Sequence, residues 1–142
     1  MIPRISSYNK PMVSERINTA EIIEKYRAEY KKLRAINSVA IGDKIHFNMF
    51  GFKHLIFKGK HRRESAVIFN RLVLIPLIAP VIYNCAEEKE IRIRKEIIDG
   101  KKIAVTYYAL EAHVGKDSVR VRVVTRKVGS KGKHYFQSIM KY

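Results

Sequence analysis

The chain has 142 residues, of which 46% are hydrophobic and 30% are charged. This composition is typical of a globular protein and excludes a disordered chain. The formal net charge is +16, from 29 Lys and Arg against 13 Asp and Glu, so we expect an anionic partner such as RNA, DNA, a membrane surface or an acidic protein.

Targeting and redox signals are sparse. Cys85 is the only cysteine, which excludes an intrachain disulfide and agrees with a reducing compartment. The N-terminal sequence MIPRISSYNK has no apolar core and does not have the pattern of a secretory signal. The most apolar run, residues 72–83, contains two prolines and is too short to span a bilayer. We therefore expect a cytoplasmic protein that makes no membrane contact.

The first part of the chain is predicted to be helical. Residues 1–17 are expected to form an irregular N-terminal arm, because prolines and polar residues dominate there. A single α+β domain then occupies residues 18–142. Its first helix is expected to start near Asn18, with apolar residues recurring at helical spacing. Residues 39–48 suggest a short strand or an extended segment with a turn, and residues 64–75 suggest a second, buried helix.

The second half of the chain changes to the alternating pattern of strands. Asp99-Gly100 is a strong signal for a tight turn between two such runs. The predicted strands cover residues 90–98, 102–112, 118–128 and 134–140. Short turns join them, so they should form an antiparallel meander. The predicted fold class is α+β, with N-terminal helices packed on a four-stranded antiparallel meander sheet.

Two basic blocks contain almost no acids. Residues 51–63, GFKHLIFKGKHRR, contain two histidines and no acid, and residues 118–142 are rich in Lys and Arg with interleaved aromatic residues. Metal-free cleavage of RNA needs a base for the 2′-OH, an acid for the leaving 5′-oxygen and cations for the phosphorane. Histidine can perform both proton transfers near neutral pH. A solvated cationic surface without chemistry is the alternative.

The candidate residues follow from these two blocks. The predicted catalytic residues are His54, His61, Thr125, Ser138 and His134. The predicted residues for RNA or phosphate binding are Lys58, Lys60, Arg62, Arg63, Arg120, Arg122, Arg126, Tyr135 and Phe136. No metal site or cofactor is predicted, because the sequence has no CxxC, no HExxH and no carboxylate cluster beside a histidine.

The order of these segments resembles a known group of small ribonucleases. A basic–histidine segment, an apolar helix SAVIFNRLVLI and the strands YYALEA, VRVRVVTRK and KHYFQSIMK follow one another. This pattern resembles the barnase–EndoU–colicin–RelE (BECR) fold of phages and mobile elements, over residues 45–142. The resemblance implies a metal-independent endoribonuclease, often a toxin restrained by an acidic antitoxin or immunity protein. Carried over by position, its site would use His54, His61 and Arg62, together with Thr125 and Ser138.

Three functional hypotheses remain open from the sequence. The first is an endoribonuclease that leaves a 2′,3′-cyclic phosphate on RNA such as tRNA or ribosome-bound mRNA. The second is a non-catalytic basic module that binds RNA or DNA, and the third is a protein held by charge alone at a membrane or ribosome surface. The enzymatic hypothesis predicts that His54, His61, Thr125 and Ser138 converge in one basic cleft.

Overall fold

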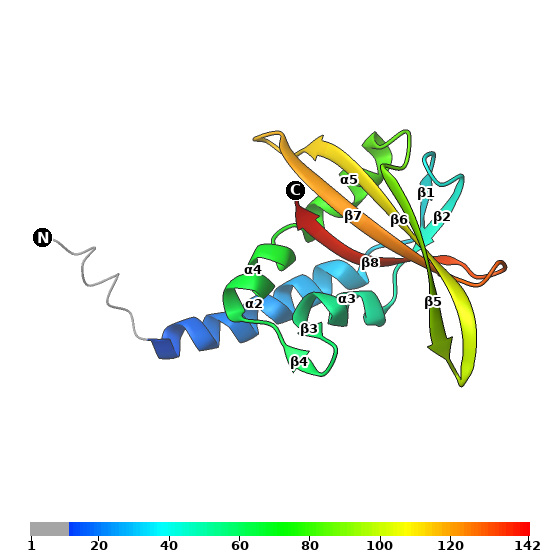
Figure 1. Ribbon diagram of the computed structural model, residues 1–142. Coiled ribbons are helices and arrows are strands. Elements are labelled where there is room, and N and C mark those ends of the chain that lie inside the picture. Colours follow the sequence, from blue (N-terminus) through cyan, green and yellow to red (C-terminus); the bar gives the residue numbers. More distant parts are fainter. Residues whose placement is uncertain (1–11) are drawn as a thin grey trace, which may run out of the picture.

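The computed structural model describes the backbone of residues 12–142 and the side chains of residues 19–142. The described helices all precede the four long strands of residues 90–141, as predicted (Figure 1). The helical segments are α2 (Met12–Lys31), α3 (Met49–Ile56), α4 (Ser65–Leu72), the 3₁₀ turn η1 (Ile75–Leu77) and α5 (Ile78–Asn84). The strands are β1 (Ile36–Ser38), β2 (Asp43–His46), β3 (Phe57–Lys58), β4 (His61–Arg62), β5 (Glu90–Ile98), β6 (Lys101–Val114), β7 (Val119–Val128) and β8 (His134–Lys141).

Helix α2 begins earlier than the sequence pattern suggested. Its first residue is Met12, so the prediction of an irregular arm over residues 1–17 is wrong for residues 12–17. Residues 1–11 of that predicted arm lie outside the described residues. Proline is well tolerated at the start of a helix, so Pro11, directly before Met12 in the sequence, agrees with a helix start at this point.

The main sheet is larger and less regular than predicted. Strands β5 to β8 form the expected antiparallel meander, but the sheet has six strands in the order β1-β2-β8-β7-β6-β5. The prediction of a four-stranded antiparallel sheet is therefore only partly confirmed. The two added strands are short, and β2 pairs in parallel with the start of β8, at His134 and Tyr135. Strands of three and four residues are too short to show an alternating pattern in the sequence.

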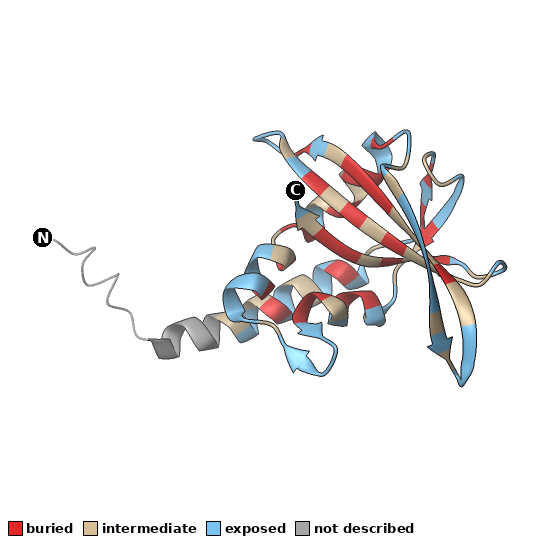
Figure 2. Ribbon diagram, viewed as in Figure 1, coloured by how far each residue is buried: buried red, intermediate tan, exposed pale blue. Residues whose placement is uncertain are grey.

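Helices cover one face of this sheet. Leu110, Val123 and Ile139 of the strands belong to the core that the helices complete. Ser65–Asn84 has the length and apolar composition of a membrane span, but in this fold it is divided into α4, η1 and α5. Buried residues from all three segments belong to the core, and Cys85, directly after α5, is buried as predicted. The outer strand β5 stays largely uncovered (Figure 2).

A very close contact holds α3 against β8. Strand β2 pairs only with the first residues of β8, and α3 lies beside the remainder of that strand. A Cβ atom at Gly51 would lie 2.5 Å from the backbone oxygen of Phe136 and 2.9 Å from the Tyr30 hydroxyl. That hydroxyl also donates a hydrogen bond to the backbone oxygen of Asn48, the N-cap of α3. Glycine at position 51 therefore lets α3 reach the strand edge, while Tyr30 anchors its first turn.

Candidate functional site

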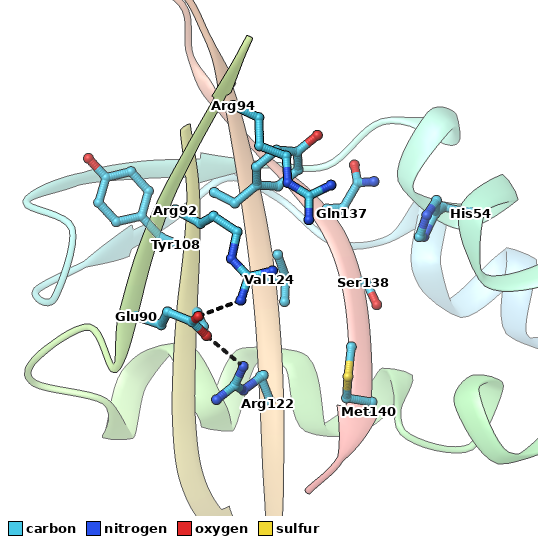
Figure 3. A pocket seen from close by; sticks show the side chains of 12 residues that line it. His54, Glu90, Arg92, Arg94, Tyr108, Arg122, Val124, Gln137, Ser138 and Met140 are labelled. Carbon is cyan, nitrogen blue, oxygen red and sulfur yellow. Dashed lines mark hydrogen bonds and ion pairs between the residues drawn. The ribbon is translucent and has the colours of Figure 1, made fainter. Parts of the chain in front are cut away.

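A cavity of about 430 Å³ lies on the sheet face that points away from the core (Figure 3). The strand register explains its position. One row of paired residues crosses four strands in the order Glu90, Ala109, Val124 and Ser138. The two central residues of this row have small apolar side chains, so they leave a hollow between the polar ends. Longer side chains of the neighbouring rows, Tyr107 on one side and Arg122 on the other, form the walls.

A bulge in β8 aims Ser138 into this cavity. Phe136 pairs with Thr125 and Ser138 pairs with Val124, so Gln137 is an extra residue between the two pairs. In a regular strand, Phe136 and Ser138 would point to the same face. The bulge reverses this relation, because an inserted residue shifts the alternation by one position. Phe136 therefore enters the core, whereas Gln137 and Ser138 line the cavity.

Three cationic or titratable side chains from the helical side lie close to one another beside β8. Arg71 of α4 donates a hydrogen bond from Nη1 to Ser138 Oγ at 2.9 Å. Arg63 donates from Nε to the backbone oxygen of His54 at 3.2 Å, and the His54 side chain of α3 lines the cavity beside β8 (Figure 3). Within residues 19–142, neither arginine forms an ion pair with a carboxylate. The cluster therefore has positive charge with no anion to balance it.

The electrostatics of this cluster favour neutral His54. Burial lowers the pKa of His54 below its usual 6.5, and the charges of Arg63 and Arg71 lower it further. A hydrogen bond with the backbone of Gln137 acts in the opposite direction, but the net shift is downward. The ring is thus unprotonated at pH 7, and its buried Nδ1 has no hydrogen-bond partner within the described structure. Burial and the charge of Arg63 also lower the pKa of Arg71, as expected for cations held together without an anion.

Comparisons with protein-family models, curated proteins and solved structures find no match for this chain. The site is therefore interpreted from its own geometry. Among the described residues, no group of three or more His, Cys, Asp or Glu side chains is placed to hold a metal ion. The arrangement offers a neutral imidazole, a hydroxyl and two guanidinium groups at one end of an open cavity, which is chemistry suited to an anionic substrate.

Two of the four residues expected to converge do so. His54 and Ser138 line the same cavity, and Arg63, a predicted phosphate ligand, lies beside them. His61 instead lies on the exposed β3–β4 hairpin, so the prediction that it joins His54 is wrong. This hairpin also exposes Lys58, Lys60 and Arg62. The six residues between the two histidines include the end of α3 and a turn, which separates the histidines in space.

Thr125 and His134 do not reach the cavity either. Thr125 is fully buried and follows Val121 and Val123 on the core face of β7, where its hydroxyl has no partner within the described residues. His134 is 3% exposed at the β2–β8 junction, where Asp43 lies 3.8 Å away and the Tyr108 ring packs against it. The prediction of catalytic roles for both residues is not supported by their positions, because neither can contact a substrate bound in the cavity.

The arginines of β7 are already paired. Arg120 and Arg122 both donate to Glu111 of β6, Arg122 also reaches Glu90 of β5, and Arg126 pairs with Glu96. Their role in RNA or phosphate binding stays a prediction, and of the three only Arg122 borders the cavity. The predicted stacking role of Phe136 is wrong, since its ring lies in the core. Tyr135 stays partly exposed, with its ring against His46.

Several residues that line the cavity or contact its lining were not singled out from the sequence. Arg71 lies in a helix that otherwise seemed suited to the core, and an isolated arginine there was the available signal. Arg94 and Gln137 also line the cavity. Gln137 acquires its position from the bulge, which no local pattern announces. Tyr107 of β6 forms one wall of the cavity and donates a hydrogen bond to Glu96.

Proposed function

We propose that this protein is a metal-independent endoribonuclease whose substrate phosphate binds between His54, Arg71 and Ser138. The observation that carries the proposal is the hydrogen bond of 2.9 Å from Arg71 to Ser138, beside an unprotonated histidine and with no ion pair of Arg71 to a carboxylate within residues 19–142. A cluster of unpaired cations around a hydroxyl is the environment that a phosphodiester requires. The resemblance to the barnase–EndoU–colicin–RelE group supports the same reaction class.

Each side chain has a distinct role in the proposed reaction. His54 accepts the proton of the 2′-OH, because its lowered pKa keeps it neutral at pH 7. The 2′-oxygen attacks phosphorus and the bond to the 5′-oxygen breaks, which leaves a 2′,3′-cyclic phosphate. Arg63 and Arg71 stabilise the charge of the phosphorane. Ser138 accepts its hydrogen bond from Arg71, so its own proton is free to be donated to a phosphate oxygen.

The leaving 5′-oxygen needs a proton donor, and we assign this role to Tyr107. Burial, and then its hydrogen bond to Glu96, raise the pKa of this phenol, so the hydroxyl stays protonated at neutral pH. Its hydrogen bond to Glu96 must open before the proton is transferred. Arg126 also contacts the hydroxyl, at 3.3 Å, and can hold the phenolate that results.

The direct test is cleavage of total RNA and of tRNA in EDTA by the purified protein, repeated in a translating extract to include ribosome-bound mRNA. We expect products with 2′,3′-cyclic phosphate ends, and a fall of about 100- to 10,000-fold for His54→Ala. His61→Ala is the matched control, because this histidine belongs to the same basic stretch but lies outside the cavity. Intact RNA in every assay, from a sample that melts cooperatively, would contradict the proposal.

A non-catalytic RNA- or DNA-binding module is the second candidate. The exposed β3–β4 hairpin favours this function, because it presents four basic or histidine side chains to solvent. Binding of a nucleic acid needs this charge but no catalytic arrangement of side chains. Binding that weakens steeply with salt, with no cleavage of any nucleic acid, would select this function. We also propose, from the same resemblance, that an acidic antitoxin or immunity protein binds this protein and restrains its nuclease activity.

A further inference from the structure

The cavity extends well beyond the proposed phosphate position. His54 and Ser138 lie at one end, whereas Glu90, Arg92 and Arg94 of β5 line the other. Strand β5 is three strands away from β8, a distance of about 14 Å at the usual spacing of neighbouring strands. A phosphate group at the first end leaves most of the remaining space unfilled. The bound substrate must therefore contribute another group to the cavity.

The floor of this second part has the shape and polarity of a base-binding surface. Ala109 and Val124 form a cross-strand pair, and Met140 lies beside them in the lining. These side chains are apolar and, for Ala109, very short, so a flat ring can lie on them. The Tyr107 wall adds an aromatic edge. Apolar and aromatic contacts of this kind are how proteins hold single-stranded bases.

The rim carries polar groups without partners. Arg94 forms no ion pair and no hydrogen bond among the residues that the structure describes, although its charge helps to lower the pKa of Glu96. Its guanidinium extends from β5 across the sheet toward Gln137, whose side-chain amide is likewise unengaged within residues 19–142 (Figure 3). By contrast, Arg92 and Arg122 are both bound to Glu90. Arg94 and Gln137 are thus the groups that remain available to the edge of a base.

We propose that this cavity binds the nucleobase next to the cleaved phosphate, and that Arg94 gives it a preference for guanine. The proposal rests on the proposed function, since the phosphate position orients the nucleotide. Guanine presents two adjacent acceptors, O6 and N7, which match the two parallel donors of a guanidinium fork. Adenine replaces one of these acceptors with a donor, and the pyrimidines lack the pair.

The test compares the binding of 3′-GMP, 3′-AMP, 3′-CMP, 3′-UMP, guanosine and inorganic phosphate by calorimetry. We expect the native protein to bind 3′-GMP about 5- to 150-fold more tightly than 3′-AMP, the range for one bidentate contact. Arg94→Ala should remove this preference without changing the affinity for phosphate. Lys95→Ala is the matched control, because Lys95 is the next residue of β5 and is not part of the cavity.

A second variant tests the floor separately. Ala109→Leu fills the hollow, so every nucleotide should bind no better than phosphate, and thermal melting checks that this variant folds. Equal binding of all four nucleotides by the native protein, or a guanine preference that survives Arg94→Ala, would overturn the inference even if RNA is cleaved. Retained binding of guanosine, with neither phosphate binding nor RNA cleavage, would support the base site and overturn the proposed function alone.

Discussion

The two basic blocks look alike in the sequence and differ completely in the fold. On the helical side, Arg63 and Arg71 gather around His54 with no carboxylate among the described residues to balance them. On the sheet side, Glu111 accepts hydrogen bonds from Arg120 Nη2 at 2.8 Å and from Arg122 Nε at 2.7 Å. The arginines of the helical side keep their positive charge available for a ligand, whereas those of β7 form ion pairs within the sheet.

The difference follows from where the neighbours of each block come from. Strand β7 has no acids of its own, but glutamates of β5 and β6 form ion pairs with its arginines. Glu111 pairs with Arg122 in the register, and both lie on the outer face. Among residues 19–142, no acid of the helical side forms an ion pair with Arg71. A run without acids in the sequence therefore indicates a free cationic surface only when its spatial neighbours are also free of acids.

The largest expected effect separates the helical side from the sheet side. Arg71→Ala should lower kcat for RNA cleavage by about 100- to 1,000-fold, because it removes a donor to the phosphorane. Arg120→Ala should leave cleavage near its native rate, since that arginine is paired with Glu111 and does not line the main cavity. Single-turnover cleavage of a short RNA measures both. Equal losses for the two variants would break the comparison.

Moving the helical side away from the sheet should have the next largest effect. Gly51→Ala places a methyl group 2.5 Å from the Phe136 oxygen, so α3 must shift and the variant should lose about 1–3 kcal/mol of stability. A shift of about 1 Å at His54 would also cost about 100-fold in rate. Urea unfolding and cleavage assays test this. Lys53→Ala, on an exposed position of the same helix, is the control and should have little effect.

The direction of the Gly51→Ala result is itself informative. Replacing glycine with alanine inside a helix normally stabilises it by about 1 kcal/mol. An increase in stability would therefore show that the space between α3 and β8 can hold a methyl group at position 51. That result would contradict the close contact between Gly51 and Phe136.

Glu111→Gln should lower the free energy of unfolding through the sheet side, without changing the arrangement of His54 and the arginines on the helical side. Glu111 is buried, and loss of its charge leaves two arginines with a weaker acceptor, at an expected cost of about 1–3 kcal/mol in the free energy of unfolding. Urea melts at pH 7 measure this cost, and phosphate binding should stay unchanged. A variant as stable as the native protein would mean that the pairing contributes nothing.

The same pairing predicts a pH dependence. Burial raises the pKa of Glu111, but the hydrogen bonds and charges of Arg120 and Arg122 outweigh it, so the net shift is downward. A lowered pKa in the folded state contributes stability at neutral pH, and this contribution is lost as the pH falls below about 4.3. The difference in stability between the native protein and Glu111→Gln should therefore shrink in acid.

The smallest expected effect is a displacement of the pH–rate profile. Because the pKa of His54 is lowered, kcat/KM should fall only below pH 6.5. Arg63→Gln removes one of the charges that lower this pKa, so the acid limb should move to higher pH. Lys60→Gln, on the exposed hairpin, is the control and should leave the limb in place. An unmoved limb in Arg63→Gln would mean that another group controls the rate.

The sequence predicted the meander well and the rest of the sheet poorly, for a physical reason. Alternation over β5 to β8 and the Asp99-Gly100 turn are local signals, and the observed strands match them closely. Strands β1 and β2 are too short for such a signal, and the parallel pairing of β2 with β8 joins segments far apart in the chain.

The site was predicted in part for the same reason. The sequence was sufficient to name His54 and Ser138 as candidates, from their residue types and their neighbours. It was not sufficient to predict which of the candidate residues would lie close together. Arg71 contacts Ser138 across 67 positions, and the orientation of Ser138 depends on the bulge at Gln137. Thr125 and His134 have suitable chemistry, and only their burial excludes them from the cavity.

The place of β8 in the sheet has a consequence for the order in which the protein is made. This strand is the last of the chain, yet it lies between β2 and β7 and not at an edge. It supplies Ser138 and Gln137 and is the surface on which α3 settles. During synthesis, which proceeds from the N-terminus, the helices and three strands of the meander emerge before the site can be complete. A nascent chain therefore carries the histidine and the arginines without the serine that joins them, and it becomes competent for the proposed chemistry only after release of its final strand.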